Sequence, residues 1–219
     1  MMKDLYILFD MDGVIFDTER LAAECWMEVA RQEGIQGIEQ VLLDCTGVTE
    51  AVSRQIFFKA YGDRVDYDAF RKKAKALLPG KCPGGVLPMK KGAGEILRWL
   101  KETGIPAALA SSTRSETVLR ELRDAGIDML FGAIVCGDMV RNSKPDPEIF
   151  LTAAKRLGAK PEQCLVIEDS HNGIRAARAA GMHPIMVPDR MAVTDEMRQK
   201  AEWILPDLCA VQELVKSLR

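Results

Sequence analysis

Five short runs of apolar residues, spread along the whole chain, constrain the fold most strongly. Each run is continuous, which indicates a strand buried on both faces, as in a parallel sheet. Helical patterns separate the runs, and together these elements predict an α/β fold with a doubly wound, mostly parallel, Rossmann-like sheet. The predicted strands are Leu5–Phe9, Pro106–Ala110, Ala133–Cys136, Cys164–Ile167 and Pro184–Val187.

The interval from residue 18 to residue 88 breaks this alternation, because it holds helical patterns and no convincing strand. We expect it to form an α-helical cap domain, inserted into an α/β core domain made of residues 1–17 and 89–219. Two turn-forming segments, Pro79-Gly80 and Pro83-Gly84-Gly85, are suited to a hinge where the cap returns to the core.

The bulk composition excludes several classes of partner. The chain has 219 residues, 47% of them hydrophobic, and its formal net charge of −2 gives no electrostatic case for a nucleic-acid or membrane-surface partner. The apolar run in residues 1–9 is too short for a signal-peptide core, and no stretch approaches the roughly 20 apolar residues that span a bilayer. We expect a monomer or a weak homodimer.

The six cysteines are scattered, and none belongs to a Cys-x-x-Cys pair. With only His171 and His183 available as further ligands, this pattern argues against a zinc site. Cys136 and Cys164 lie inside apolar runs, where a buried free thiol is the ordinary expectation. We therefore expect a reducing, cytoplasmic compartment.

Polar residues that can carry chemistry follow four of the five predicted strands. In an open parallel sheet, ligands bind at the carboxyl ends of the strands, so these residues are expected to converge on one edge. Carboxylates alone would repel a phosphate, whereas hard oxygen ligands beside a lysine suggest Mg²⁺ together with a phosphate. In chain order the residues are Asp10, Asp12 and Gly13; Ser111, Ser112 and Thr113; Ser143 and Lys144; and Glu168, Asp169 and Ser170.

Each segment alone also has a simpler structural explanation. Asp-x-Asp-Gly is a common turn, and a lysine before a proline is usually a solvated loop residue. Thr113-Arg-Ser-Glu116 matches a helix capping box, and Glu168-Asp169-Ser170 resembles the acidic start of a helix. The order of the segments, each just past a predicted strand, favours a shared site over four unrelated loops.

The four segments resemble the ordered motifs of the haloacid-dehalogenase superfamily: Asp10-Met-Asp-Gly-Val-Ile-Phe-Asp17, Ala110-Ser111-Ser112, Ser143-Lys144-Pro145 and Ile167-Glu168-Asp169-Ser170. The inserted helical cap is similar to the subgroup that contains phosphoglycolate phosphatases, sugar-phosphate phosphatases and β-phosphoglucomutases. The resemblance implies a Mg²⁺-dependent phosphatase that hydrolyses a small phosphate monoester, such as a sugar phosphate, through an aspartyl-phosphate intermediate.

The same resemblance implies a role for each motif residue. Asp10 is the expected nucleophile and Asp12 the general acid and base, with Ser111 and Lys144 binding the phosphoryl group. The expected Mg²⁺ ligands are Asp10, Asp12 through its backbone carbonyl, and Asp169, with Glu168 as a further candidate. The expected substrate-binding residues are Ser112, Thr113 and Arg114 in the core and Thr18, Glu19, Gly47 and Glu50 in the cap.

Two alternatives remain open at this stage. A β-phosphoglucomutase-like mutase is favoured by Thr113 and Arg114, but the cap has Leu21-Ala22-Ala23 where mutases typically carry a histidine, and Thr49-Glu50-Ala51 where they carry an arginine. Arg54, one helical turn further on, is a candidate substitute for that arginine. A non-catalytic binding or regulatory protein is the second alternative, and it is disfavoured because every catalytic carboxylate is present.

Overall fold

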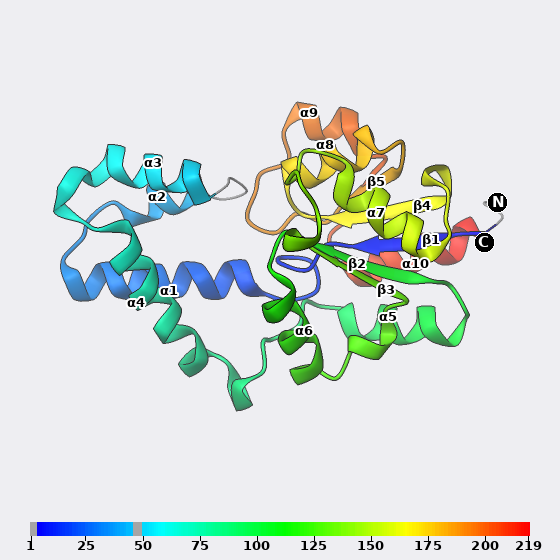
Figure 1. The fold of residues 1–219 in the computed structure, drawn as a ribbon, viewed down its shortest axis with the longest axis horizontal. Coiled ribbons are helices and arrows are strands. Elements are labelled where there is room, and N and C mark those ends of the chain that lie inside the picture. Colours follow the sequence, from blue (N-terminus) through cyan, green and yellow to red (C-terminus); the bar gives the residue numbers. More distant parts are fainter. Residues whose placement is uncertain (1–3, 46–49) are drawn as a thin grey trace.

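The computed structural model describes residues 4–45 and 50–219, and these residues form a six-stranded sheet flanked by helices (Figure 1). All neighbouring strands are parallel, in the order β3-β2-β1-β4-β5-β6, which confirms the predicted fold class. The strands are β1 (Tyr6–Phe9), β2 (Ala107–Ser111), β3 (Ala133–Cys136), β4 (Cys164–Glu168), β5 (His183–Met186) and β6 (Trp203–Ile204).

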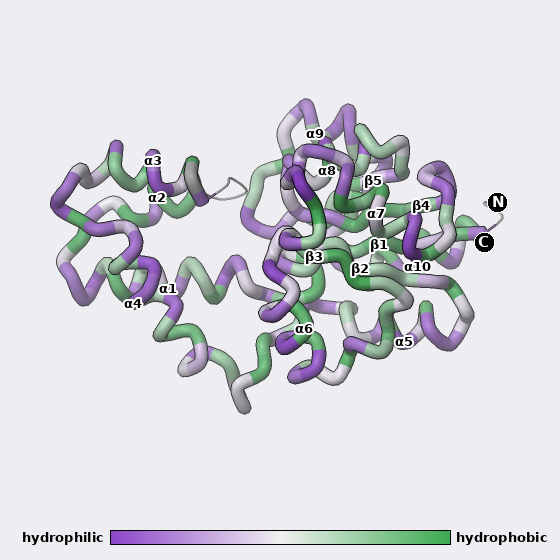
Figure 2. The backbone as a smooth tube through the Cα atoms, in the orientation of Figure 1, coloured by the Kyte–Doolittle hydropathy of each residue, from purple (hydrophilic) through white to green (hydrophobic). Residues whose placement is uncertain are grey.

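Both faces of the sheet are covered, which explains why the strands are continuously apolar. Ile7 and Phe9 of β1 pack in one hydrophobic cluster with α5 (Ala93–Glu102), α6 (Ser115–Asp124) and α10 (Leu208–Leu218). Leu8 points to the other face and packs with α7 (Glu148–Leu157) and α8 (His171–Ala179). Figure 2 shows the apolar residues concentrated along the strands, whereas the outer helices alternate between apolar and polar residues. A short helix, α9 (Asp195–Lys200), precedes β6.

Four α-helices, among the described residues between β1 and α5, pack around a separate hydrophobic cluster. They are α1 (Thr18–Glu33), α2 (Ile38–Cys45), α3 (Glu50–Tyr61) and α4 (Tyr67–Lys81). The partly buried indole of Trp26 packs against this cluster and makes edge contacts with Phe57 and Phe70, at ring-centroid distances of 5.9 and 5.3 Å. These helices stand to one side of the sheet in Figure 1. We call residues 18–88 the cap, and its limits as a domain stay a prediction.

Two chain segments connect the cap helices to the sheet, and they run side by side. Asp17 N–H donates to the Pro88 carbonyl at 2.9 Å, and Lys90 N–H donates to the Ile15 carbonyl at 2.8 Å. The predicted turn at Pro83-Gly84-Gly85 is present, with positive φ at both glycines. The predicted turn at Pro79-Gly80 is wrong, because α4 continues through both residues to Lys81. None of the helices in the described part of the chain combines the length and hydropathy that a bilayer-spanning helix needs.

Candidate active site

The chain turns sharply after β1 and brings Asp10 and Asp12 to the carboxyl edge of the sheet. Ile15 and Phe16 N–H both donate to the Met11 carbonyl, at 2.8 and 3.0 Å, which closes the turn. Gly13 adopts a φ of +78°, and a Cβ there would lie 2.3 Å from Oδ2 of Asp169. Glycine is therefore required both for the turn and for the close approach of the Asp169 carboxylate.

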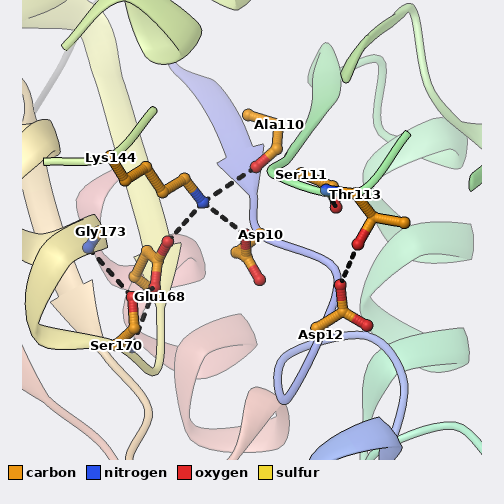
Figure 3. A network of polar contacts seen from close by, with 9 residues as sticks. All are labelled: Asp10, Asp12, Ala110, Ser111, Thr113, Lys144, Glu168, Ser170 and Gly173. Atoms are coloured by element: carbon orange, nitrogen blue, oxygen red, sulfur yellow. Dashed lines mark hydrogen bonds and ion pairs between the residues drawn. The ribbon is translucent and has the colours of Figure 1, made fainter. Parts of the chain in front are cut away.

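Lys144 reaches from the loop after β3 into the same edge, where its side chain is only 6% exposed. Its ammonium pairs with Oδ1 of Asp10, lies 2.6 Å from Oε1 of Glu168, and donates to the Ala110 carbonyl at 3.1 Å (Figure 3). Burial lowers the pKa of Lys144, but the charges of Asp10 and Glu168 outweigh burial and raise it. The lysine is thus a fixed buried cation and not a solvated loop residue.

Glu168, at the end of β4, has both carboxylate oxygens engaged. Oε1 contacts Lys144, and Oε2 accepts hydrogen bonds from the Ser170 N–H and hydroxyl, each at 2.9 Å. The Ser170 hydroxyl also accepts from Gly173 N–H at 3.0 Å, so Ser170 caps α8 as the sequence suggested. A Cβ on Gly173 would lie 1.9 Å from Oε1 of Glu168, which shows how closely α8 packs on this carboxylate.

Three buried carboxylates, Asp10, Glu168 and Asp169, gather at this edge with ligand oxygens within 4.8 Å of one another. Burial raises the pKa of Asp10 to about 8, opposed by Lys144 and reinforced by Glu168 and Asp12. Burial and the charges of Glu168 and Asp10 likewise raise the pKa of Asp169 well above its usual value. Since Lys144 supplies only one positive charge, the cluster would be balanced by a further cation with a preference for hard oxygen ligands.

Asp12 is turned away from this cluster and toward β2. Its Oδ2 accepts a hydrogen bond of 2.9 Å from the Thr113 hydroxyl, and Thr113 N–H donates to the buried Ser111 hydroxyl at 3.0 Å. The predicted capping box at Thr113 is wrong, because α6 begins at Ser115, whose N–H and hydroxyl both bond Asp138. The Thr113 hydroxyl instead donates its hydrogen bond to Asp12, which lies 101 residues away in sequence.

A cleft of about 550 Å³ opens over these residues between the sheet edge and the cap. Of the predicted residues, Asp10, Asp12, Glu19, Glu50, Ser112, Thr113, Lys144 and Asp169 line it. Thr18, Arg114 and the buried Ser111 are not among the described residues that line the cleft. Gly47 lies outside the described residues.

The cleft also contains a residue that the sequence did not single out. Arg71, on α4, contacts Oε2 of Glu50 at 2.6 Å and lines the cleft. Arg54, the candidate from the sequence, instead bonds Asp68 at 2.6 and 2.7 Å and lines a different hollow. The sequence of a helical cap does not indicate which arginine faces the cleft, because that depends on how α4 packs against α1.

Replacing Gly173 with alanine tests the packing of α8 on Glu168. We expect Gly173→Ala to displace the carboxylate from Lys144, to destabilise the fold by about 1–3 kcal/mol, and to lower turnover. Gly80→Ala is the matched control, since a Cβ at this helical position meets nothing within 4 Å. Urea unfolding measures both variants, and equal stability for the two would contradict the tight contact at Gly173.

Comparison with known proteins decides the family. The model of the haloacid dehalogenase-like hydrolases matches residues 7–187. The chain belongs to this family. The predicted superfamily and the predicted enzyme class, a hydrolase of this kind, are therefore confirmed.

Individual relatives are similar over most of their length. A phosphorylated carbohydrates phosphatase of Thermotoga maritima is 35% identical over 179 residues, which are 82% of this chain and 82% of the relative. A β-phosphoglucomutase of Bacillus subtilis is 33% identical and covers 83% of this chain and 82% of its own length. A haloacid dehalogenase family hydrolase of Deinococcus radiodurans, solved with bound phosphate and sodium, is 27% identical with a TM-score of 0.82, covering 99% of this chain and 97% of that one.

Proposed function

We propose that this protein is a Mg²⁺-dependent phosphatase that hydrolyses a small phosphate monoester, of the sugar-phosphate class, through an aspartyl-phosphate intermediate. The observation that carries this proposal is the buried group of Asp10, Lys144, Glu168 and Asp169 beside Asp12, under a cleft of about 550 Å³. Similarity to a phosphatase of phosphorylated carbohydrates supports the substrate class.

In the proposed mechanism, Asp10 attacks the phosphorus and the bond to the leaving oxygen breaks. Asp12 donates a proton to the departing alcohol and then takes a proton from the water that hydrolyses the aspartyl phosphate. The hydrogen bond from Thr113 holds the Asp12 carboxylate on the side of the cleft away from the acidic cluster. Lys144 neutralises charge on Asp10 and on the phosphoryl oxygens, and Ser112 lies at the cleft wall to donate to them.

The donor set fits Mg²⁺, because buried carboxylates outnumber the buried lysine. We place Asp10, Asp169 and the Asp12 carbonyl as the direct ligands. Glu168, whose oxygens already bond Lys144 and Ser170, holds the lysine and contacts the metal through water or not at all. The bound ion would offset the repulsion between Asp10 and an anionic substrate.

A mutase is the second candidate, supported by similarity to a β-phosphoglucomutase and by the polar residue Thr113 after the second motif, which lines the cleft. The cap favours hydrolysis, because a mutase carries a cap arginine that grips the second phosphate of its substrate. Here Arg71 is paired with Glu50 and Arg54 with Asp68. Release of inorganic phosphate from a hexose phosphate, measured against interconversion of hexose 1- and 6-phosphates, separates the two activities.

A panel of phosphate esters, assayed with Mg²⁺ and with EDTA, tests the proposal directly. We expect turnover of p-nitrophenyl phosphate and of several sugar phosphates with Mg²⁺. With EDTA we expect this activity to fall at least about 100-fold, because the acidic cluster without its cation repels an anionic substrate. Restoring Mg²⁺ should restore activity. A panel without any Mg²⁺-dependent phosphate release would overturn the proposal and favour a non-catalytic role.

A further inference from the structure

One lysine joins the two chain segments that lead into the cap to the loop after β5. The ammonium of Lys90, on the segment that returns from the cap, donates to Oδ1 of Asp189 at 2.7 Å and lies 3.6 Å from Oδ1 of Asp17. Asp17 directly precedes α1, and Asp189 follows the end of β5. We call these three residues the Lys90 bridge, and its two hydrogen-bonded members lie 99 residues apart in sequence.

The Lys90 bridge is largely shielded from solvent. The exposed fractions of the side chains are 25% for Lys90, 19% for Asp17 and 12% for Asp189. Salt and water screen a partly buried ion pair less than an exposed one, so this bridge exerts more force than a surface pair. Oδ2 of Asp17 accepts a separate hydrogen bond from Arg20, which leaves Oδ1 to face the lysine.

The backbone on both sides of the bridge is anchored to the sheet. Lys90 N–H donates to the Ile15 carbonyl, and Val187 N–H donates to the Glu168 carbonyl, each at 2.8 Å. The lysine therefore has a fixed base, and the loop after β5 has a fixed start beside the acidic cluster. From that base the ammonium reaches two segments that continue toward the cleft.

Each carboxylate of the bridge lies two positions before a residue of the cleft wall. Glu19 follows Asp17 on the first turn of α1, and Met191 follows Asp189 in the loop. Among the described residues, none of the three bridge members lines the cleft itself. The bridge thus stands behind two walls of the cleft, and the separation of its two carboxylates affects how far apart these walls stand.

Other polar groups at this place do not hold the two segments together. In the described part of the chain, Oγ1 of Thr18 and Oδ2 of Asp189 are buried and form no hydrogen bond. Burial and the charges of Asp12 and Asp189 raise the pKa of Glu19, whereas the charge of Arg190 lowers it. The negative charges of the two segments therefore repel one another, and removing the lysine would strengthen that repulsion.

We propose that Lys90 is a positioning residue, whose ammonium sets the spacing of the two cleft walls that carry Glu19 and Met191. It does so by neutralising Asp17 and Asp189 behind these walls. The inference rests on the proposed phosphatase function and adds to it a residue that acts on substrate binding from outside the cleft. The groups at the sheet edge keep their own contacts without the bridge, so its loss should weaken binding more than it slows the chemical step.

The first test separates KM from kcat with p-nitrophenyl phosphate and Mg²⁺. For Lys90→Met we expect KM to rise about fivefold or more while kcat stays within about threefold, because the walls separate and the reacting groups do not move. Inorganic phosphate, which is too small to span the walls, should inhibit with a Ki within about twofold of the wild type. An unchanged KM would overturn the inference.

Two matched variants accompany this measurement. Lys90→Arg keeps the positive charge between the carboxylates and should restore KM to within about twofold of the wild type. Lys91→Met removes the neighbouring lysine, which pairs with Asp207 outside the cleft, and should leave KM and kcat unchanged. An equal rise of KM in Lys91→Met would assign the effect to the segment as a whole and not to the Lys90 bridge.

A double variant tests the charge argument. Asp189→Asn added to Lys90→Met removes one of the two carboxylates that the lysine neutralises, so we expect at least half of the increase in KM to be recovered. A role in packing alone predicts the opposite, because the second substitution then adds to the damage. A KM in the double variant at or above that of Lys90→Met would therefore overturn charge neutralisation as the mechanism.

Hydrogen exchange tests the position of the walls without any turnover. In Lys90→Met we expect the amides of residues 17–24 and 187–194 to exchange about threefold faster or more, whereas those of β1 and β4 keep the wild-type rate. Unchanged exchange in both segments would overturn the inference. A wild-type protein that hydrolyses no p-nitrophenyl phosphate would instead overturn the proposed function, and the exchange rates would still decide whether Lys90 holds the two segments.

Discussion

Asp10→Asn is expected to lower kcat for p-nitrophenyl phosphate by about 10⁴–10⁶-fold while the protein stays folded. The amide cannot attack phosphorus, but it can still accept a hydrogen bond from Lys144, so the side chain keeps its place. The variant also removes one charge from a buried group of three carboxylates. Without metal we therefore expect the free energy of unfolding to stay constant or to rise by about 1 kcal/mol.

The pairing of lost activity with undiminished stability distinguishes a nucleophile from a structural residue. Replacing a residue that only supported the fold would lower the activity and the free energy of unfolding together. Phosphate release and urea unfolding in EDTA give the two measurements, and Asp124→Asn, at an exposed position of α6, controls for the loss of one negative charge. Turnover within tenfold of the wild type would remove Asp10 from the mechanism.

The sheet could be predicted because each strand is buried on both faces and so leaves a continuous apolar run. The predicted start of β2 was one residue too early. The strand begins at Ala107, because Pro106 has no N–H to donate and only accepts a hydrogen bond from Ile7 at 3.0 Å. The edge strand β6 was missed, because the two residues Trp203 and Ile204 are too few to form a recognisable pattern.

The sheet-edge part of the site was also predictable, since parallel strands deliver their carboxyl ends to one edge whatever the helices do. Asp10, Lys144, Glu168 and Asp169 meet there although up to 159 positions separate them in sequence. Arg71 was not predictable, because its position depends on how the cap helices pack. Thr113 shows the same limit, since a distant carboxylate outcompeted the local capping pattern.

Lys144→Met is expected to cost about 3–5 kcal/mol of the free energy of unfolding in EDTA, because it leaves buried carboxylates without their cation. Methionine has a similar length and packs against the neighbouring Phe150 ring, so the loss is electrostatic more than steric. Mg²⁺ should recover part of the stability by binding the folded cluster. Lys91→Met, which breaks an exposed ion pair with Asp207, should change stability little.

A double variant makes this argument stricter. If Lys144 acts by balancing charge, then Glu168→Gln added to Lys144→Met removes one unpaired carboxylate and should restore a large part of the lost stability. Activity should stay low in the double variant, because the lysine that faces Asp10 and the phosphoryl group is still missing. Additive losses in urea unfolding would contradict charge balance and would leave packing as the reason that Lys144 is buried.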